Sequence, residues 1–285
     1  MRRPVFPSRS AAVTLAALSL ALAPAAVAQI DAVGVQSPMA SGARSLALGG
    51  AGVALGGDVW GSSNPAAWST LAQREVALYA DQAYTLAELR TGAIRVALPF
   101  RMATVAAGAQ TFGFEEFRIT GGMIGAARAF RLGTTRRVHA GLAAHVQNLS
   151  FENHGSATAV SVDAGVLTDV LPRLTVGARA SNLLGTGFAG APLPRHLTVG
   201  AAFRADPRLT VVMDLDQEVR EELSVRAGVE VKPVPMLAIR AGASSAPLRL
   251  GVGAAVQVNR LTADLAASIH PVLGVTPGIG LSARF

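Results

Sequence analysis

The segment LRLGVGAAVQV, residues 248–258, alternates between apolar and polar or small residues along its whole length. Successive side chains of a β-strand point to opposite faces, so such a segment has one apolar and one polar face. The apolar face carries Leu248, Leu250, Val252, Ala254, Val256 and Val258. The other face carries Arg249, Gly251, Gly253, Ala255 and Gln257. This pattern predicts a strand that lies between two different environments.

The same alternation recurs from residue 74 to the C-terminus, with clear examples at 209–215, 223–231 and 261–269. It predicts about fourteen strands. No helical crossover separates them, so adjacent strands are expected to pair antiparallel. We place the strands near 74–84, 89–100, 102–112, 117–130, 137–150, 158–168, 173–184, 195–205, 208–218, 222–232, 236–243, 247–258, 260–270 and 275–285.

A water-soluble β-sandwich would also alternate, but three features favour an all-β transmembrane antiparallel barrel. Nearly every segment keeps its charges on one face, which is rich in Gly, Ala and Arg, and the chain begins with an export signal. The last segment ends at Phe285, in phase with Ile279, Leu281 and Ala283. It resembles the terminal strand that the barrel-assembly machinery reads in outer-membrane proteins. Aromatic residues make up only 5% of the chain, so a complete aromatic girdle is not expected.

Residues 1–28 are typical of a cleaved signal peptide, with Arg2 and Arg3 before a short apolar run and Ala26-Val27-Ala28 at its end. The apolar run is too short for a membrane-spanning helix, which needs roughly 20 residues. The chain has no cysteine and a formal net charge of +7, part of which belongs to the signal peptide. The remaining charge is too small and too dispersed to indicate nucleic-acid binding.

The stretch from Ser41 to Leu71 lacks the alternation and contains both tryptophans of the chain. Asn64 and Pro65 predict the start of a short helix, with Asn64 as N-cap. An ordinary N-terminal loop is the simpler interpretation, but a barrel of about fourteen strands has room for a plug. We therefore expect residues 29–73 to form a hatch inside a barrel of residues 74–285.

The sequence GARSLALGGAGVALGGDVWGSSNPAAW resembles the N-terminal hatch of the FadL-type outer-membrane channel superfamily. The matching positions are Ala43-Arg44, Gly49-Gly50-Ala51, Asp58 and Asn64-Pro65-Ala66. Trp68 follows them in the expected hatch, where it should pack on the lumen wall or line an apolar pocket. The resemblance covers the hatch, and the strands follow it only in style. It implies passive uptake of a small hydrophobic compound or, as in the PorV/PorQ members, partnership with a type IX secretion machinery. The short predicted outer loops are closer in style to PorV/PorQ proteins than to fatty-acid channels.

The polar faces of the predicted strands place many charges in the lumen. These are Arg118, Arg128, Asp163, Arg179, Arg204, Asp214, Asp216, Arg226, Glu230, Arg240, Arg249, Asp264 and Arg284. We expect Asp214 or Asp216 near Arg204 and Arg226, and Asp264 near Arg249 and Arg284. Arg44 and Asp58 of the hatch are expected to meet lumen charges of opposite sign. Such charges either hold barrel and hatch together or line a polar path.

No catalytic or metal-binding motif stands out, so we expect neither an enzyme nor a cofactor. His139 and His145 share a strand face but are too far apart for one metal, and hydrogen-bonded lumen histidines are the simpler interpretation. Expected partners are outer-membrane lipid, the barrel-assembly machinery, and either a hydrophobic small molecule or secretion-system proteins. A structural barrel without a transport path is the third alternative.

Overall fold

The computed structural model describes residues 40–61, 64–133, 136–153, 155–188, 192–219 and 221–285. All of them belong to one compact unit, residues 34–285. The expected signal peptide and residues 29–39 of the expected hatch lie outside the described residues. None of the helices in the described part of the chain has the length and apolar character needed to cross a membrane.

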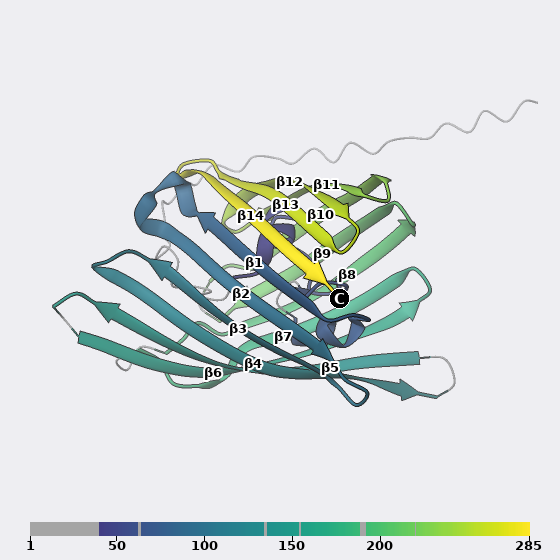
Figure 1. Ribbon diagram of the computed structural model, residues 1–285, viewed down its shortest axis with the longest axis horizontal. Coiled ribbons are helices and arrows are strands. Elements are labelled where there is room, and N and C mark those ends of the chain that lie inside the picture. The colour runs from purple at the N-terminus through teal and green to yellow at the C-terminus, as the bar shows by residue number, and fades with distance from the viewer. Residues whose placement is uncertain (1–39, 62–63, 134–135, 154, 189–191, 220) are drawn as a thin grey trace, which may run out of the picture. The chain divides into compact units, whose positions relative to one another are not determined.

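Fourteen strands form a closed barrel in which every neighbouring pair is antiparallel (Figure 1). The first and last strands, β1 and β14, also pair and close the ring, with Glu75 opposite Arg284. The strands are β1 Glu75–Gln82, β2 Arg90–Pro99, β3 Thr104–Gly113, β4 Phe117–Leu132, β5 Arg136–Phe151, β6 Gly155–Leu171, β7 Leu174–Gly185, β8 His196–Asp206, β9 Leu209–Glu218, β10 Ser224–Val234, β11 Leu237–Ser245, β12 Leu248–Val258, β13 Leu261–His270 and β14 Gly274–Arg284.

The predicted all-β antiparallel barrel and the positions of its fourteen strands are confirmed. The largest differences are in β4, β5 and β6, which are 16, 16 and 17 residues long and extend past the predicted boundaries. β4 pairs with β5 up to Leu132 and Arg136, and β5 pairs with β6 up to Phe151 and Gly155. The longer pairing extends these strands past the boundaries that the alternation predicts. Two short 3-10 helices, η3 Ala83–Thr85 and η4 Ala87–Leu89, connect β1 to β2.

The two faces of the sheet differ as the alternation predicts. Val252 and Val211 are 48% and 39% exposed, whereas Gly251 and Val212 beside them are buried. Large apolar side chains are exposed in the same way on most strands, among them Ile94, Leu142, Val160, Leu197, Ile239, Leu265 and Ile279. A water-soluble monomer rarely exposes so continuous an apolar surface. The barrel therefore has an apolar outer face and a polar inner face.

Two arginines predicted for the lumen face outward. Arg118 and Arg128 of β4 are exposed, whereas Ile119 and Ala127 beside them are buried. The phase of β4 was mistaken because it has apolar residues on both faces, Ile119 inside and Ile124 outside. Alternation cannot fix the phase of such a strand.

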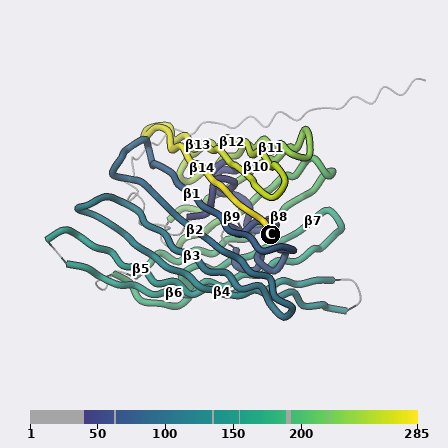
Figure 2. The backbone as a smooth tube through the Cα atoms, viewed as in Figure 1, coloured from purple at the N-terminus to yellow at the C-terminus, as the bar shows by residue number. Residues whose placement is uncertain are grey.

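Residues 40–61 and 64–73 lie against inward-facing residues of the barrel wall (Figure 2). They contain the helix α1 Gly42–Ala47 and the 3-10 helix η2 Pro65–Thr70. Helix α1 lies against β12, β13 and β14, and η2 lies against β4, β5 and β6. Asn64 caps η2, because its side chain accepts a hydrogen bond from the backbone N–H of Ala66 at 3.0 Å. The cap predicted from Asn64-Pro65 is thus present, whereas α1 was not predicted.

Candidate functional site

Glycines on the inner wall let residues 40–61 and 64–73, here called the N-terminal segment, approach the wall backbone closely. A Cβ atom placed on Gly242 of β11 would lie 2.1 Å from the carbonyl carbon of Leu48. At Gly141 of β5 it would lie 2.5 Å from the carbonyl carbon of Pro65. Real Cβ atoms do not approach backbone so closely, and only glycine allows the contact. The inward glycines in contact with the segment are Gly125, Gly141, Gly165, Gly177, Gly228, Gly242, Gly251, Gly253 and Gly278, here called the glycine trough.

Asn64 joins two parts of the segment to the wall. Its amide nitrogen donates to the carbonyl oxygen of Val53 at 2.7 Å and to that of Val166 on β6 at 3.2 Å. The residue is fully buried, so each of these hydrogen bonds replaces one to water. The Asn-Pro-Ala motif therefore holds the segment to β6 as well as starting a helical turn.

Asp214 of β9 binds the other side of the segment. Its Oδ2 atom accepts hydrogen bonds from the backbone N–H groups of Gly52 and Val53, at 2.7 and 2.8 Å. A carboxylate that accepts two backbone N–H bonds is a charge-assisted contact, which is stronger than a neutral hydrogen bond. Asp214 or Asp216 was predicted to lie near Arg204 and Arg226; Asp214 lies opposite Arg226 across the β9–β10 pair, and its carboxylate binds backbone groups of the segment.

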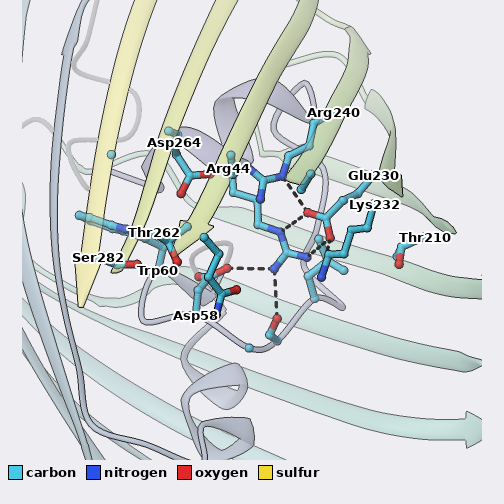
Figure 3. A pocket seen from close by; sticks show the side chains of 18 of the residues that line it. Arg44, Asp58, Trp60, Thr210, Glu230, Lys232, Arg240, Thr262, Asp264 and Ser282 are labelled. Atoms are coloured by element: carbon cyan, nitrogen blue, oxygen red, sulfur yellow. Dashed lines mark hydrogen bonds and ion pairs between the residues drawn. The ribbon is translucent and has the colours of Figure 1, made fainter. Parts of the chain in front are cut away.

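Arg44 is the charged anchor of the segment. Its Nε and Nη2 atoms donate to the two oxygens of Glu230 on β10, at 2.9 and 3.0 Å, and Nη1 donates to Asp58 at 3.0 Å (Figure 3). Glu230 also accepts from Nε of Arg240 at 2.7 Å, and Arg240 in turn contacts Asp264. Burial alone would lower the pKa of Arg44, but Glu230 and Asp58 outweigh that effect and raise it. Arg44 meets a lumen carboxylate as predicted, whereas Asp58 pairs with Arg44 of its own segment.

The aromatic part of the segment packs around an arginine that the sequence analysis did not single out. Arg95 of β2 is buried, donates to the carbonyl oxygen of Trp60 at 3.1 Å, and lies 4.9 Å from the centroid of the Trp60 ring. Tyr79 packs edge-on against the same ring. Trp68 donates from its indole nitrogen to the carbonyl oxygen of Val59 at 2.9 Å. The side chain of Arg95 faces inward, in phase with the alternation of β2. A charged residue inside an otherwise apolar run was the sequence feature that could have identified it.

Of the ion pairs predicted around Asp216, one is present and one is not. Asp216 pairs with Arg226 at 2.5 Å as predicted, and it also accepts from the hydroxyl of Thr198. Arg204 donates to the hydroxyl of Thr175 on β7 at 2.9 Å and makes no ion pair with a described carboxylate.

Arg284 pairs with Glu75 across the β1–β14 closure at 2.9 Å, and not with Asp264, whose partner is Arg240. Arg179 lies within electrostatic range of Asp163. Arg249 faces inward, and its Nε atom is buried without a hydrogen-bond partner among the described residues.

The other residues named from the sequence, Gly49, Gly50, Phe285, His139 and His145, take part in turns, strand pairing and side-chain contacts. Gly49 and Gly50 have positive φ angles of 67° and 81°, where an L side chain would be strained. Phe285 is exposed and pairs with Arg74 through backbone N–H and C=O groups. His139 lies 2.6 Å from the hydroxyl of Ser69, and Nε2 of His145 lies 3.5 Å from Asp163. No group of three potential metal ligands occurs in the part of the chain that the structure describes.

A cavity of about 550 Å³ lies between the segment and the wall strands that surround Glu230 (Figure 3). Its polar lining includes Arg44, Asp58, Thr210, Glu230, Lys232, Arg240, Thr262, Asp264 and Ser282. Of its cations, Arg44, Arg240 and Arg284 have carboxylate partners at hydrogen-bonding distance, whereas Arg204 and Arg173 bond to uncharged oxygens. The cavity is thus a charged chamber of mixed sign, suited to water and polar solutes.

Comparison with known proteins identifies the fold but no family. No family model matches the chain, and no curated protein matches its sequence. The CymD monoaromatic hydrocarbon channel superposes with a TM-score of 0.63 at 13% identity, over 86% of this chain and 97% of CymD. The Pseudomonas putida toluene transporter TodX gives 0.58 at 13% identity, over 86% and 98%. Omp33, an outer membrane protein of Acinetobacter baumannii, gives 0.53 at 13% identity, over 75% and 98%.

These neighbours are channels and an outer-membrane barrel rather than enzymes. They share the barrel fold with this chain, and the resemblance of residues 43–68 to a FadL-type hatch stays a prediction. The closer resemblance to PorV/PorQ proteins, the hatch role of the N-terminal segment and the signal peptide stay predictions. At 13% identity the likeness establishes the barrel fold, and the solutes of the neighbours are not thereby those of this chain.

Proposed function

We propose that the protein is an outer-membrane channel for the passive passage of small molecules, with the N-terminal segment as a hatch. The observation that carries the proposal is that this segment lies against the inner wall. It packs in the glycine trough, and it is held by Asn64 of the segment and by Asp214 and Glu230 of the wall. The apolar outer face and the fold shared with CymD and TodX support a place in a membrane.

The class of solute rests on two observations that point in different directions. Both named neighbours are channels for aromatic hydrocarbons, which favours a small hydrophobic compound. The cavity beside the segment is charged, which favours a polar solute. We propose the hydrophobic compound as the solute and water as the usual content of the charged chamber.

Uptake by whole cells tests the choice of solute. The protein is expressed in a Gram-negative host whose outer membrane excludes apolar solutes, and entry of labelled toluene is compared with entry of a pentose of similar size. The proposal expects toluene entry to rise several-fold over cells with an empty vector, while pentose entry stays unchanged. A rise for the pentose alone would make the protein a polar porin, and a rise for neither would favour a structural barrel or a secretion partner.

Deletion of residues 30–70 tests the hatch. The barrel should still fold, because strand pairing and the outer face are untouched, and it should still migrate faster on a gel when it is not boiled. Its conductance in a planar bilayer should exceed that of the full chain, since a barrel of this size holds water once it is emptied. A folded, truncated barrel that conducts no better than the full chain would show that the segment does not block the lumen.

The PorV/PorQ-like partnership with a secretion machinery is the alternative. The observation that favours it is the shortness of most connections, for example two residues between β11 and β12 and three between β13 and β14. Retrieval of secretion-system proteins with the intact protein from its own cells, without any effect on toluene entry, would support this alternative.

A further inference from the structure

The two ends of the barrel carry opposite charges. Because neighbouring strands are antiparallel, alternate connections lie at the same end, and one end also bears the C-terminus. Basic residues at or beside the connections of that end are Arg74, Arg101, Arg131, Arg136, Arg137, Arg173, Arg208, Lys232, Arg260 and Arg284, against Glu75, Asp169 and Asp206. Acidic residues at the other end are Asp81, Glu88, Glu115, Glu116, Glu152, Glu218, Glu221 and Glu222, against Arg90, Arg118, Arg195 and Arg249 among the described residues. We call them the basic end and the acidic end.

At the basic end β4 and β5 continue as a two-stranded hairpin past their last pairs with β3 and β6 (Figure 1). The last pair between β3 and β4 is Thr104 with Ala127, and the last pair between β5 and β6 is Val138 with Thr168. Beyond them, β4 and β5 pair only with each other. The sequence of residues 128–137, RAFRLGTTRR, contains four arginines and no acidic residue.

The outward face of this hairpin combines cations with apolar side chains. Arg128, Phe130 and Leu132 alternate outward on β4, and Arg136 lies opposite Leu132 on β5. The guanidinium carbon of Arg128 lies 5.5 Å from the centroid of the Phe130 ring. Arg128 and Arg136 take part in none of the ion pairs between described residues. Unpaired guanidinium groups beside an exposed aromatic ring are typical of a membrane interface.

The spacing along β4 places Arg128 at the edge of an apolar band. Arg118 and Arg128 both face outward, and the outward residues between them, Thr120, Gly122, Ile124 and Ala126, are uncharged. Ten residues at about 3.3 Å each, on a strand tilted by about 40°, span about 25 Å along the barrel axis. This matches the height of about 25 Å that is usual for the lipid-facing band of outer-membrane barrels. The two arginines therefore lie at the two interfaces.

We propose that Arg128 and Arg136, with the ring of Phe130 beside Arg128 on the same outward face, bind phosphate groups of anionic phospholipid in the leaflet at the basic end. The inference rests on the membrane location in the proposed function, but not on any transported solute. A guanidinium group binds phosphate through two parallel hydrogen bonds, and the ring of Phe130 packs beside the guanidinium group of Arg128. The rest of the basic end adds long-range attraction to the same anionic surface.

Native mass spectrometry of the whole protein in detergent micelles tests the proposal. The probes are a phosphatidylglycerol and a phosphatidylcholine with the same acyl chains, added at equal concentrations. Phosphatidylglycerol is expected to stay bound at lower concentration than phosphatidylcholine. The double variant Arg128→Gln/Arg136→Gln should weaken phosphatidylglycerol binding by about tenfold, and Arg128→Lys/Arg136→Lys should fall between the two.

The matched control is Arg208→Gln/Arg260→Gln, which removes the same charge from turns of the same end. It should change phosphatidylglycerol binding by no more than about twofold, since charges off the outer face act only at long range. Equal loss in both double variants, equal binding of both lipids, or no loss in Arg128→Gln/Arg136→Gln would each overturn the proposal. Faster migration of unboiled protein confirms that each variant is folded. A protein that inserts into vesicles without lipid preference fails this inference alone, whereas a protein that does not insert fails the proposed function.

Discussion

The barrel wall and the N-terminal segment are held by different kinds of contact. In the wall one rule repeats fourteen times: strands pair antiparallel, and alternate side chains face outward. In the segment no rule repeats, and it is held by single contacts of Arg44, Asn64 and the backbone of Gly52 and Val53. Repeated strand pairing tolerates a substitution at one position of the wall. The N-terminal segment is held by a few separate contacts, so each substitution at such a contact removes part of its stability.

Two probes separate the regions experimentally. Both tryptophans, Trp60 and Trp68, belong to the segment and are buried, so tryptophan fluorescence reports the segment. Faster migration of unboiled protein on a gel reports the closed barrel. The four substitutions below are expected to affect these probes differently, in order of decreasing effect.

Glu230→Ala should have the largest effect on the segment. It leaves Arg44 and Arg240 without their shared carboxylate, and removal of one partner of a buried ion pair costs about 3–5 kcal/mol. In a urea titration, the fluorescence transition should shift to lower concentration, while gel migration without urea stays that of a closed barrel. In the control Arg44→Met/Glu230→Met, part of the loss should return, because Arg44 is no longer left unpaired. Loss of barrel migration would show that wall and segment are not separate.

Val252→Arg or Val211→Arg should instead destabilise the wall. Both valines are exposed on the outer face, where an arginine near the membrane midplane costs about 2–4 kcal/mol. Refolding titrations into vesicles measure this cost. Thr210→Arg is the matched control, since Thr210 lines the polar cavity and an arginine there should cost much less. Ser224 also faces inward, but it is buried opposite Asp216 and is therefore not used as a control. Equal costs at Val211 and Thr210 would contradict the assigned faces.

Gly242→Val tests the close approach of the two regions. Its side chain would collide with the backbone of Leu48, and overpacking of this kind costs about 1–3 kcal/mol. We expect the segment to be displaced, which proteolysis of residues 40–73 and higher conductance would detect, in a barrel that still migrates as closed. Gly122→Val is the control, because its nearest neighbour is the tip of Val146 at 3.7 Å. If Gly242→Val leaves both readouts unchanged, the trough does not hold the segment.

Asn64→Ala should have the smallest effect. Loss of the N-cap costs about 1 kcal/mol, and the carbonyl oxygen of Val53 also loses its donor. The fluorescence transition should shift slightly, with no change in gel migration. Asn64→Asp keeps the cap acceptor but places a buried carboxylate oxygen against the carbonyl oxygens of Val53 and Val166, so it should cost more than Asn64→Ala. If Asn64→Ala matches the unchanged protein, the Asn-Pro-Ala motif does not anchor the segment.

The same contrast explains what the sequence could predict. Alternation is local, so the fourteen strands and the outward valines of β9 and β12 could be read from neighbouring residues alone. Arg118 and Arg128 were misplaced because β4 is apolar on both faces. The pair between Arg284 and Glu75 joins residues 209 positions apart across the barrel closure, and the choice of Arg240 as partner of Asp264 depends on how side chains cross the lumen. Such pairs depend on three-dimensional packing, which no local pattern encodes.

The glycine trough also makes the wall a receptor for a peptide. Backbone of the segment contacts bare backbone of the wall at Gly141, Gly177, Gly242 and Gly251, so part of the fit depends on shape, in addition to the side-chain contacts of Arg44 and Asn64. A receptor of this kind does not require its peptide to be part of the same chain. A barrel that begins after residue 73 is therefore expected to bind the segment when it is added as a separate peptide, as a host binds its ligand.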